Sequence, residues 1–277
     1  MMRLTLMVGA SALMAACSTA EETVDEVVDT VVMAASDDVC TTFGPQTPRD
    51  ISMKTGTNAN MFDLAPASTA LNLCNIHSHT NAEHKGPGFS VYAGPGPDGG
   101  YQCNGTDDLT AAELAPYTGE RSYEGAEPGD TIEVHWVHSS CDVQPGEGLG
   151  SCLTDACTDP KLRVETQVFL VVNDANALDM TEMDYAAGSG AGAAVHQASM
   201  IPSNTGDPII FRGSTTGPSY DQKTCSPVEV TWSVRPQCTK IDVASLHAWG
   251  KDNAFMETKS HGVRDLVTDP RLLSTIK

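Results

Sequence analysis

Histidine alternates with itself or with another polar residue in two short segments, and this spacing constrains the fold more than any other feature of the chain. The first segment reads Asn75-Ile-His-Ser-His79 and the second reads Glu133-Val-His135. Successive side chains of a β-strand point to opposite faces, so residues two apart share a face. We therefore expect two neighbouring strands of one sheet, with His77 and His79 on the same face as His135.

Three neutral imidazoles on one face can occupy three corners of a tetrahedron around a zinc ion and leave the fourth corner to water. This pattern is typical of a catalytic zinc site rather than a structural one. Neutral ligands leave the ion its full charge, so a zinc-bound water ionises near pH 7 to give hydroxide. The sequence thus predicts that His77, His79 and His135 bind Zn2+, for which cobalt is a possible substitute. Asn75 and Glu133 lie two residues before a ligand, where each could accept its second ring N–H.

Other residues near these segments fit the pattern less well. His138 lies three residues after His135 and should face away from the metal, so we expect it to hydrogen-bond around the ligands or in the core. We place His84, which follows a turn-capable segment, in the same surroundings. Cys74 should also face away from the site. The histidines without a local pattern, for which we expect surface positions, are His196, His247 and His261.

A hydroxide formed at the metal must also be oriented. A threonine hydroxyl can accept its hydrogen bond if the threonine donates its own proton to a carboxylate. The loop 213–218 contains Thr215 and Thr216, and Glu83 is a carboxylate close behind the first histidine segment. Taken alone, a Ser-Thr-Thr loop is more often only a turn.

Short strands with few helices are expected throughout residues 39–277, which show no internal repeat. Alternating or apolar runs separated by Gly/Pro-rich loops predict strands near 72–79, 89–93, 131–138, 163–172, 209–212 and 228–235. Short helices are expected at 111–114, 244–249 and 261–266. We therefore expect a mainly β (α+β) fold, with a single domain around a large twisted, mostly antiparallel sheet and short peripheral helices.

The N-terminus is not expected to belong to this domain. Residues 1–16 contain a basic Arg3 and an apolar run too short to span a membrane, which indicates a secretory signal. The run ends in Met14-Ala-Ala-Cys17, which resembles a bacterial lipobox with Cys17 as the lipidated first residue. Residues 17–38 then form an acidic tether. We expect an exported bacterial lipoprotein of the periplasm, outer membrane or cell surface, attached to the membrane only by its lipid.

The number of cysteines and the net charge indicate in which compartment the protein works and which partners it can have. Of nine cysteines, Cys17 is assigned to lipid, and the even number that remains in an exported chain indicates disulfides. The formal net charge of −20 excludes a nucleic-acid partner, because such a protein needs a basic surface. An acidic surface of this kind is usually only solvated. The sequence does not indicate an oligomeric state.

The motifs, taken in order, resemble those of the carbonic anhydrases. His-x-His, Glu-His, Glu-x-His-x-x-His and Gly-Ser-Thr-Thr follow one another as in the alpha class. The closer resemblance is to the delta class, known from marine algae and related bacterial proteins. The phrases that carry it are 75–89, 128–136, 162–169, 201–206, 213–220 and 261–264. The resemblance implies an alpha-carbonic-anhydrase-like fold and zinc-dependent reversible hydration of CO2 to bicarbonate and a proton.

The resemblance also assigns roles to single residues. His77, His79 and His135 match the zinc ligands, and Asn75 and Glu133 match the partners of the first and third ligand. One departure from the family pattern is that residues 49–76 contain no histidine to match the alpha-class proton shuttle.

Further roles follow for the threonine loop and two cysteines. Glu83 and Thr215 match the catalytic gate that orients hydroxide, and Thr216 matches its neighbour at the substrate pocket. The loop reads Ser-Thr-Thr-Gly-Pro instead of Leu-Thr-Thr-Pro-Pro, so the threonine register could shift by one. The resemblance further implies a disulfide between Cys40 and Cys225.

Two other functions compete with this interpretation. The spacing His77-x-His79 with a later Glu83 and His135 is also that of a cupin-type metal oxygenase or isomerase, in which Glu83 would be a ligand. The cupin motif has a glycine where this chain has Leu71, and it leaves the threonine loop unexplained. The second alternative is an inactive metal-binding surface lipoprotein.

Overall fold

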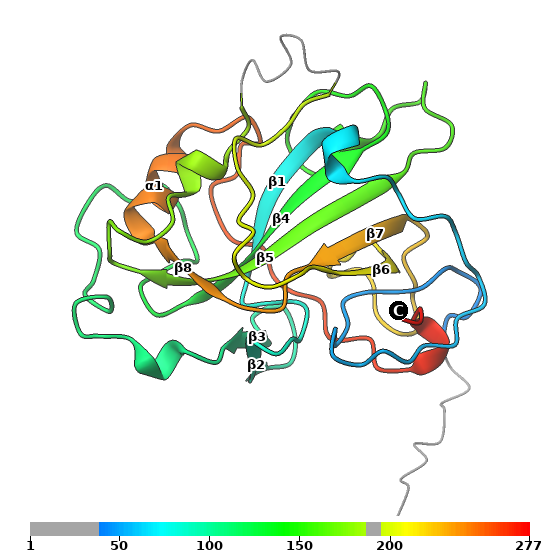
Figure 1. Cartoon of the computed structure of the whole chain (residues 1–277), viewed down its shortest axis with the longest axis horizontal. Coiled ribbons are helices and arrows are strands. Elements are labelled where there is room, and N and C mark those ends of the chain that lie inside the picture. Colours follow the sequence, from blue (N-terminus) through cyan, green and yellow to red (C-terminus); the bar gives the residue numbers. More distant parts are fainter. Residues whose placement is uncertain (1–38, 187–194) are drawn as a thin grey trace, which may run out of the picture. The chain divides into compact units, whose positions relative to one another are not determined.

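A six-stranded mixed sheet positions the histidine segments. The computed structural model describes residues 39–186 and 195–277. The sheet consists of β1 (Asn72–Thr80), β4 (Thr131–Ser139), β5 (Leu162–Val172), β6 (Ile209–Ser214), β7 (Glu229–Val234) and β8 (Thr239–Asp242). Its strand order is β1-β4-β5-β7-β6, and β8 also pairs with β5 (Figure 1). Three of the pairings are antiparallel, whereas β7 and β8 run parallel to β5.

Smaller elements complete the described chain. A two-stranded sheet pairs β2 (Phe89–Gly94) with β3 (Gly100–Cys103). Among the residues described, one α-helix is present, α1 (Val243–Lys251). The 3-10 turns are η1 (Ser68–Ala70), η2 (Thr106–Asp108), η3 (Leu149–Cys152), η4 (Met180–Met183) and η5 (Pro270–Leu272).

The sheet carries a separate apolar cluster on each face. On one face, Trp232 and Phe211 pack against the ring of His84. On the other face, Trp136 packs in the cluster that includes Trp249 of α1. Burying such large side chains supplies about 1.5–3 kcal/mol each, so the two clusters fix which face each strand residue takes. His77 and His79 of β1 and His135 of β4 lie on the same face of the sheet as Trp232.

Most of the predicted elements are present. The six predicted strands lie within two residues of their expected limits, and the predicted helix 244–249 lies inside α1. The strands β3 and β8 were not predicted, because four residues are too few to show alternation. The segment 111–114 is a turn, not a helix.

The predicted helix at 261–266 is wrong. His261 instead donates its backbone N–H to Ser78 and accepts one from Thr80, both at 2.8 Å. The chain therefore runs beside β1 in an extended form, and pairing with the sheet edge overrides the local helical pattern.

Disulfides tie the loops to the sheet. One joins Cys40 to Cys225, the pair that the resemblance implied. The others join Cys74 to Cys152, Cys103 to Cys238 and Cys141 to Cys157. All cysteines of the described residues are therefore paired.

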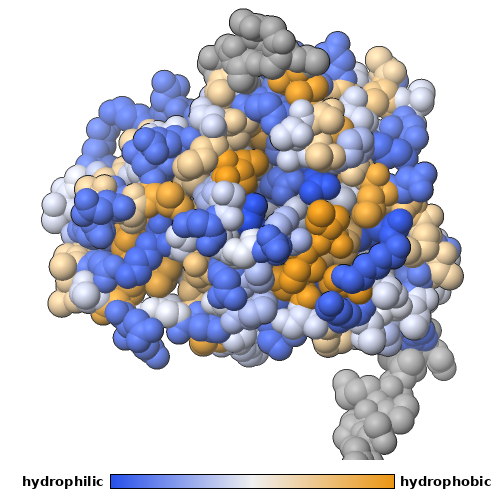
Figure 2. Space-filling view, in the orientation of Figure 1, coloured by the Kyte–Doolittle hydropathy of each residue, from blue (hydrophilic) through white to orange (hydrophobic). Residues whose placement is uncertain are grey.

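The expectations for the N-terminus lie outside the described residues. These are the signal at 1–16, the tether at 17–38 and the lipid on Cys17. Within the described part of the chain, no helix has the length and apolar character needed to cross a membrane. On the surface shown in Figure 2, hydrophilic residues predominate with smaller apolar groups between them.

Candidate metal centre

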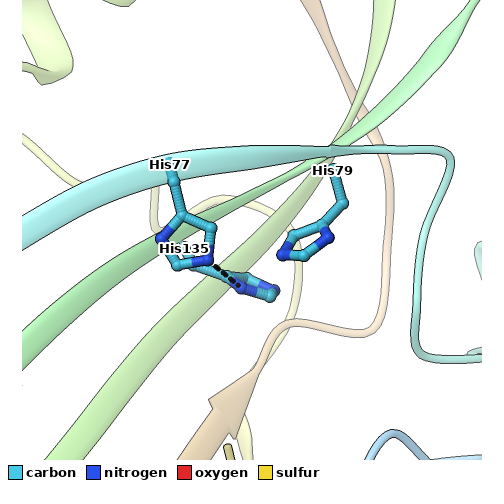
Figure 3. Close-up of side chains that lie close together, drawn as sticks. All are labelled: His77, His79 and His135. Carbon is cyan, nitrogen blue, oxygen red and sulfur yellow. Dashed lines mark hydrogen bonds between the residues drawn. The ribbon is translucent and has the colours of Figure 1, made fainter. Parts of the chain in front are cut away.

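Three imidazoles converge where β1 pairs with β4. His77 lies directly opposite His135 in the antiparallel register, and His79 follows on the same face of β1. One ring nitrogen of each lies within 4.8 Å of the other two. Nε2 of His77 is 3.2 Å from Nδ1 of His135. The rings point toward one another from the two strands (Figure 3), as the alternation of the sequence predicted.

Oxygen atoms hold the other nitrogen of both β1 histidines. Oδ1 of Asn75 lies 2.7 Å from Nδ1 of His77. The backbone carbonyl of Gly262 lies 3.1 Å from Nδ1 of His79. An oxygen acceptor favours the tautomer with the proton on Nδ1. The Nε2 lone pair of each ring is therefore available at the centre of the cluster.

The third imidazole, His135, has its Nε2 rather than its Nδ1 beside an oxygen, and that oxygen belongs to Glu133. Its Oε1 lies 3.4 Å from Nε2 of His135 and 2.8 Å from Nδ1 of His84. Its Oε2 accepts the backbone N–H groups of Glu83 and His84. Burial opposes ionisation of Glu133, but His84 and His135 outweigh it and lower its pKa. Nε2 of His135 is thus the nitrogen near the carboxylate, and Nδ1 of that ring faces the cluster.

The converging nitrogens fit a metal cation. Burial, followed by the neighbouring imidazoles, lowers the pKa of His77 well below its ordinary value, and burial lowers the pKa of His79. Both rings are therefore neutral at neutral pH, which is the form that binds metal. Nε2 of His79 is buried without a hydrogen-bond partner, and such an atom normally requires a ligand or water. Three imidazole nitrogens are a donor set that zinc accepts.

Glu83 and the threonine loop lie apart in this structure. Oε1 of Glu83 accepts the backbone N–H of Arg264 at 3.1 Å, and Oε2 is buried without a partner. The Thr215 hydroxyl is 2.6 Å from the Ser226 hydroxyl. Within residues 39–186 and 195–277, the hydrogen bond between Glu83 and Thr215 that the resemblance implied is not formed.

A cavity of about 400 Å³ opens beside the imidazoles. His77 and His79 lie on its surface together with Thr216. Its other walls come from the segments 147–149, 216–218 and 256–262. Thr216 therefore lies at the cavity.

The cavity contains residues that sequence reasoning missed. His261 was expected only at the surface, but its ring lies 6.0 Å from that of His77 and 6.2 Å from that of His79. Its Nε2 is 3.0 Å from Glu257, and this contact raises the pKa of His261. The carbonyl of Gly262 was missed too, because a backbone oxygen has no residue type to indicate it. The extended pairing of 261 with β1, which places both groups, has no local signal in the sequence.

His138 lies on the face of β4 opposite the cluster and belongs to the core, one of the two places expected for it. Its Nδ1 contacts the backbone oxygen of Trp136 at 3.0 Å, and burial lowers its pKa to about 4. The expectations for Cys74 and His247 require correction. Cys74 packs in the cluster of Trp232, on the imidazole side, because a bulge between Leu73 and Asn75 shifts the alternation. His247, expected at the surface, is buried.

Comparisons with known proteins found a similar solved structure and a matching family model. A solved structure of the alpha-carbonic anhydrase from Thermovibrio ammonificans, in complex with the inhibitor sulfanilamide, is similar at 16% sequence identity with a TM-score of 0.27. That match covers 77% of this chain and 82% of that one. No curated protein matches the chain. The family model described as delta carbonic anhydrase matches residues 68–245. This match extends over more than half of the chain, which therefore belongs to the delta carbonic anhydrase family.

Proposed function

We propose that this carbonic anhydrase hydrates CO2 reversibly to bicarbonate and a proton, with zinc held by His77, His79 and His135. One observation carries the proposal. Each of these rings has one nitrogen facing an oxygen and the other facing a common centre. Oriented neutral imidazoles of this kind are what a catalytic zinc site requires.

Zinc bound at these nitrogens would lower the pKa of a water molecule and so supply a nucleophile near neutral pH. The chain itself has to hold the rings and admit the substrate. Asn75 and the Gly262 carbonyl orient the β1 histidines, and Glu133 orients His135. The adjoining cavity of about 400 Å³ gives CO2 access to this centre. At the cavity surface, the ring of His261 can exchange a proton with solvent.

Glu83 and Thr215 remain the proposed gate. Oε2 of Glu83 is buried and unpaired, and leaving a buried acceptor unpaired costs about 1–3 kcal/mol. A threonine hydroxyl that donated to this oxygen would satisfy it and would present its lone pairs to a nucleophile. Thr215 must exchange its contact with Ser226 for one with Glu83 to do so. Thr216, already at the cavity, is the alternative if the register is shifted by one.

The cupin alternative is not supported by the geometry. A cupin site needs Glu83 among the ligands, with an oxygen beside the free imidazole nitrogens. Glu83 Oε1 instead lies 3.5 Å from Nδ1 of His79, the nitrogen that faces away from the cluster. Among the described residues, the groups able to hold a metal do not include Glu83.

Metal content and CO2 hydration of the purified domain test the proposal. His77→Ala and His135→Ala should each lose most bound zinc and nearly all activity. A variant of the buried His138 to alanine is the control and should keep its zinc. Full zinc occupancy in both ligand variants would overturn the assignment. Bound zinc without any CO2 hydration would instead support the inactive metal-binding lipoprotein.

Export and lipid attachment are part of the proposal. The disulfides of the described residues support an oxidising compartment. We propose the periplasm, outer membrane or cell surface, with attachment only through a lipid on Cys17. The proposed small-molecule partners of the protein are its substrate CO2 and its product bicarbonate.

A further inference from the structure

The β4–β5 loop, residues 140–161, forms one wall of the cavity and is tied to the metal-binding strand. Its residues 147–149 line the cavity. The disulfide between Cys141 and Cys157 closes the base of the loop. A second disulfide joins Cys152 to Cys74 of β1. Cys74 precedes Asn75, so this bond reaches the strand beside the site.

The bulge in β1 makes a backbone group available to this loop. The register pairs Leu73 with His138 and Asn75 with Val137, so Cys74 has no partner on β4. Its carbonyl instead accepts the backbone N–H of Gly146 at 3.0 Å and the hydroxyl of Ser151 at 2.8 Å. The loop thus replaces the missing strand partner.

The loop also holds the side chain that orients His77. Nδ2 of Asn75 donates to the carbonyl of Gly146 at 3.0 Å, while its Oδ1 faces Nδ1 of His77 at 2.7 Å. An amide has its donor and its acceptor on opposite sides. A flipped amide would place oxygen against the Gly146 carbonyl and N–H groups against the ring N–H. The Gly146 carbonyl therefore selects the orientation in which Asn75 keeps the Nδ1–H tautomer of His77.

We propose that Gly146 and the Cys74–Cys152 disulfide are positioning elements for His77, and that the β4–β5 loop thereby sets the affinity of the site for zinc. This inference rests on the proposed zinc site. The disulfide keeps the loop at β1, the Gly146 carbonyl fixes the Asn75 amide, and the amide fixes the ring. Loss of the disulfide should loosen this chain of contacts without removing any ligand.

Zinc affinity of the purified domain, measured by competition with a chromophoric chelator, tests the proposal. The double variant Cys74→Ser/Cys152→Ser should bind zinc about 10- to 100-fold more weakly, the range for losing a group that orients a ligand. The matched control is Cys103→Ser/Cys238→Ser, which removes a disulfide that does not border the cavity. The control closes a longer loop, with a sequence separation of 135 against 78. It should therefore lose at least as much thermal stability but keep its zinc affinity within about threefold.

A second variant and a spectrum guard against a general folding defect. Ser151→Ala removes the hydroxyl that lies 2.8 Å from the Cys74 carbonyl and 2.7 Å from the Gly148 carbonyl within the loop. It leaves both disulfides intact and should weaken zinc binding about 3- to 10-fold. The visible absorption of the cobalt-loaded protein reports ligand geometry and should change in Ser151→Ala and in the Cys74/Cys152 variant, but not in the control.

Unchanged zinc affinity in Ser151→Ala and in the Cys74/Cys152 variant would overturn the proposal. An equal loss in the control would do the same. A parent protein that binds no zinc would overturn the metal site itself, which distinguishes that failure from failure of the positioning role.

Discussion

Replacing Glu133 with glutamine would reverse the tautomer of His135. Three N–H groups donate to the carboxylate, one from the His84 ring at Oε1 and two from the backbone at Oε2, and Nε2 of His135 lies 3.4 Å from Oε1. Backbone N–H groups cannot become acceptors, so the glutamine oxygen must take the Oε2 position. The glutamine NH2 then takes the Oε1 position and faces Nε2 of His135. Because two N–H groups repel each other, Nε2 of His135 must lose its proton. The proton moves to Nδ1, the nitrogen that would bind the metal.

The size of the effect follows from these contacts. Zinc must displace the Nδ1 proton, and losing a group that orients a ligand weakens metal binding about 10- to 100-fold. That range corresponds to about 1.4–2.7 kcal/mol. The fully buried Glu133 also loses charge-assisted hydrogen bonds of about 1.5–3 kcal/mol each. The metal-free variant should therefore be less stable but still folded.

The pH dependence of stability gives a second readout of Glu133. Its pKa is lowered in the folded protein, so it contributes stability that is present above its unfolded pKa of about 4.3 and is lost as the pH falls toward the folded value. The difference in free energy of unfolding between the parent and Glu133→Gln should be full at neutral pH and shrink below about pH 4.

Zinc competition and chemical denaturation at several pH values are the assays. Glu133→Gln with the zinc affinity of the parent would refute the tautomer argument. A stability difference that grows on acidification would refute the role of the charged carboxylate.

Other changes test separate parts of the account. Thr215→Ala should retain zinc and lose about 10²-fold in CO2 hydration; if only Thr216→Ala is damaging, the loop register is shifted by one. His138→Ala should keep its zinc but unfold at a lower temperature, because it leaves a cavity in the core; loss of metal would show that the face assignment is wrong. Cys17→Ser should move from the membrane to the soluble fraction, and firm membrane association of that variant would refute the lipid anchor.

The histidine cluster was predictable because alternation in a strand is strict. His77, His79 and His135 needed only two strands in register. Ile76 and Trp136 face each other across β1 and β4 and are both buried on the opposite side of the sheet, which fixes that register.

Departures from alternation could not be predicted in the same way. The bulge at Cys74 inserts one residue, so a parity argument carried across it assigns the wrong face. The surroundings of the cluster depend on long-range contacts as well. The Gly262 carbonyl reaches His79 across a separation of 183 residues, and the loop that holds Asn75 reaches it across 71. Such contacts follow from tertiary packing, which a single sequence read by periodicity does not contain.

Anomalous diffraction at the zinc absorption edge, from crystals of the zinc-loaded domain, tests the central claim most directly. We expect one strong peak about 2.0–2.1 Å from Nε2 of His77, Nε2 of His79 and Nδ1 of His135. A peak bonded to an oxygen of Glu83, or to any other nitrogen of these rings, would contradict the account.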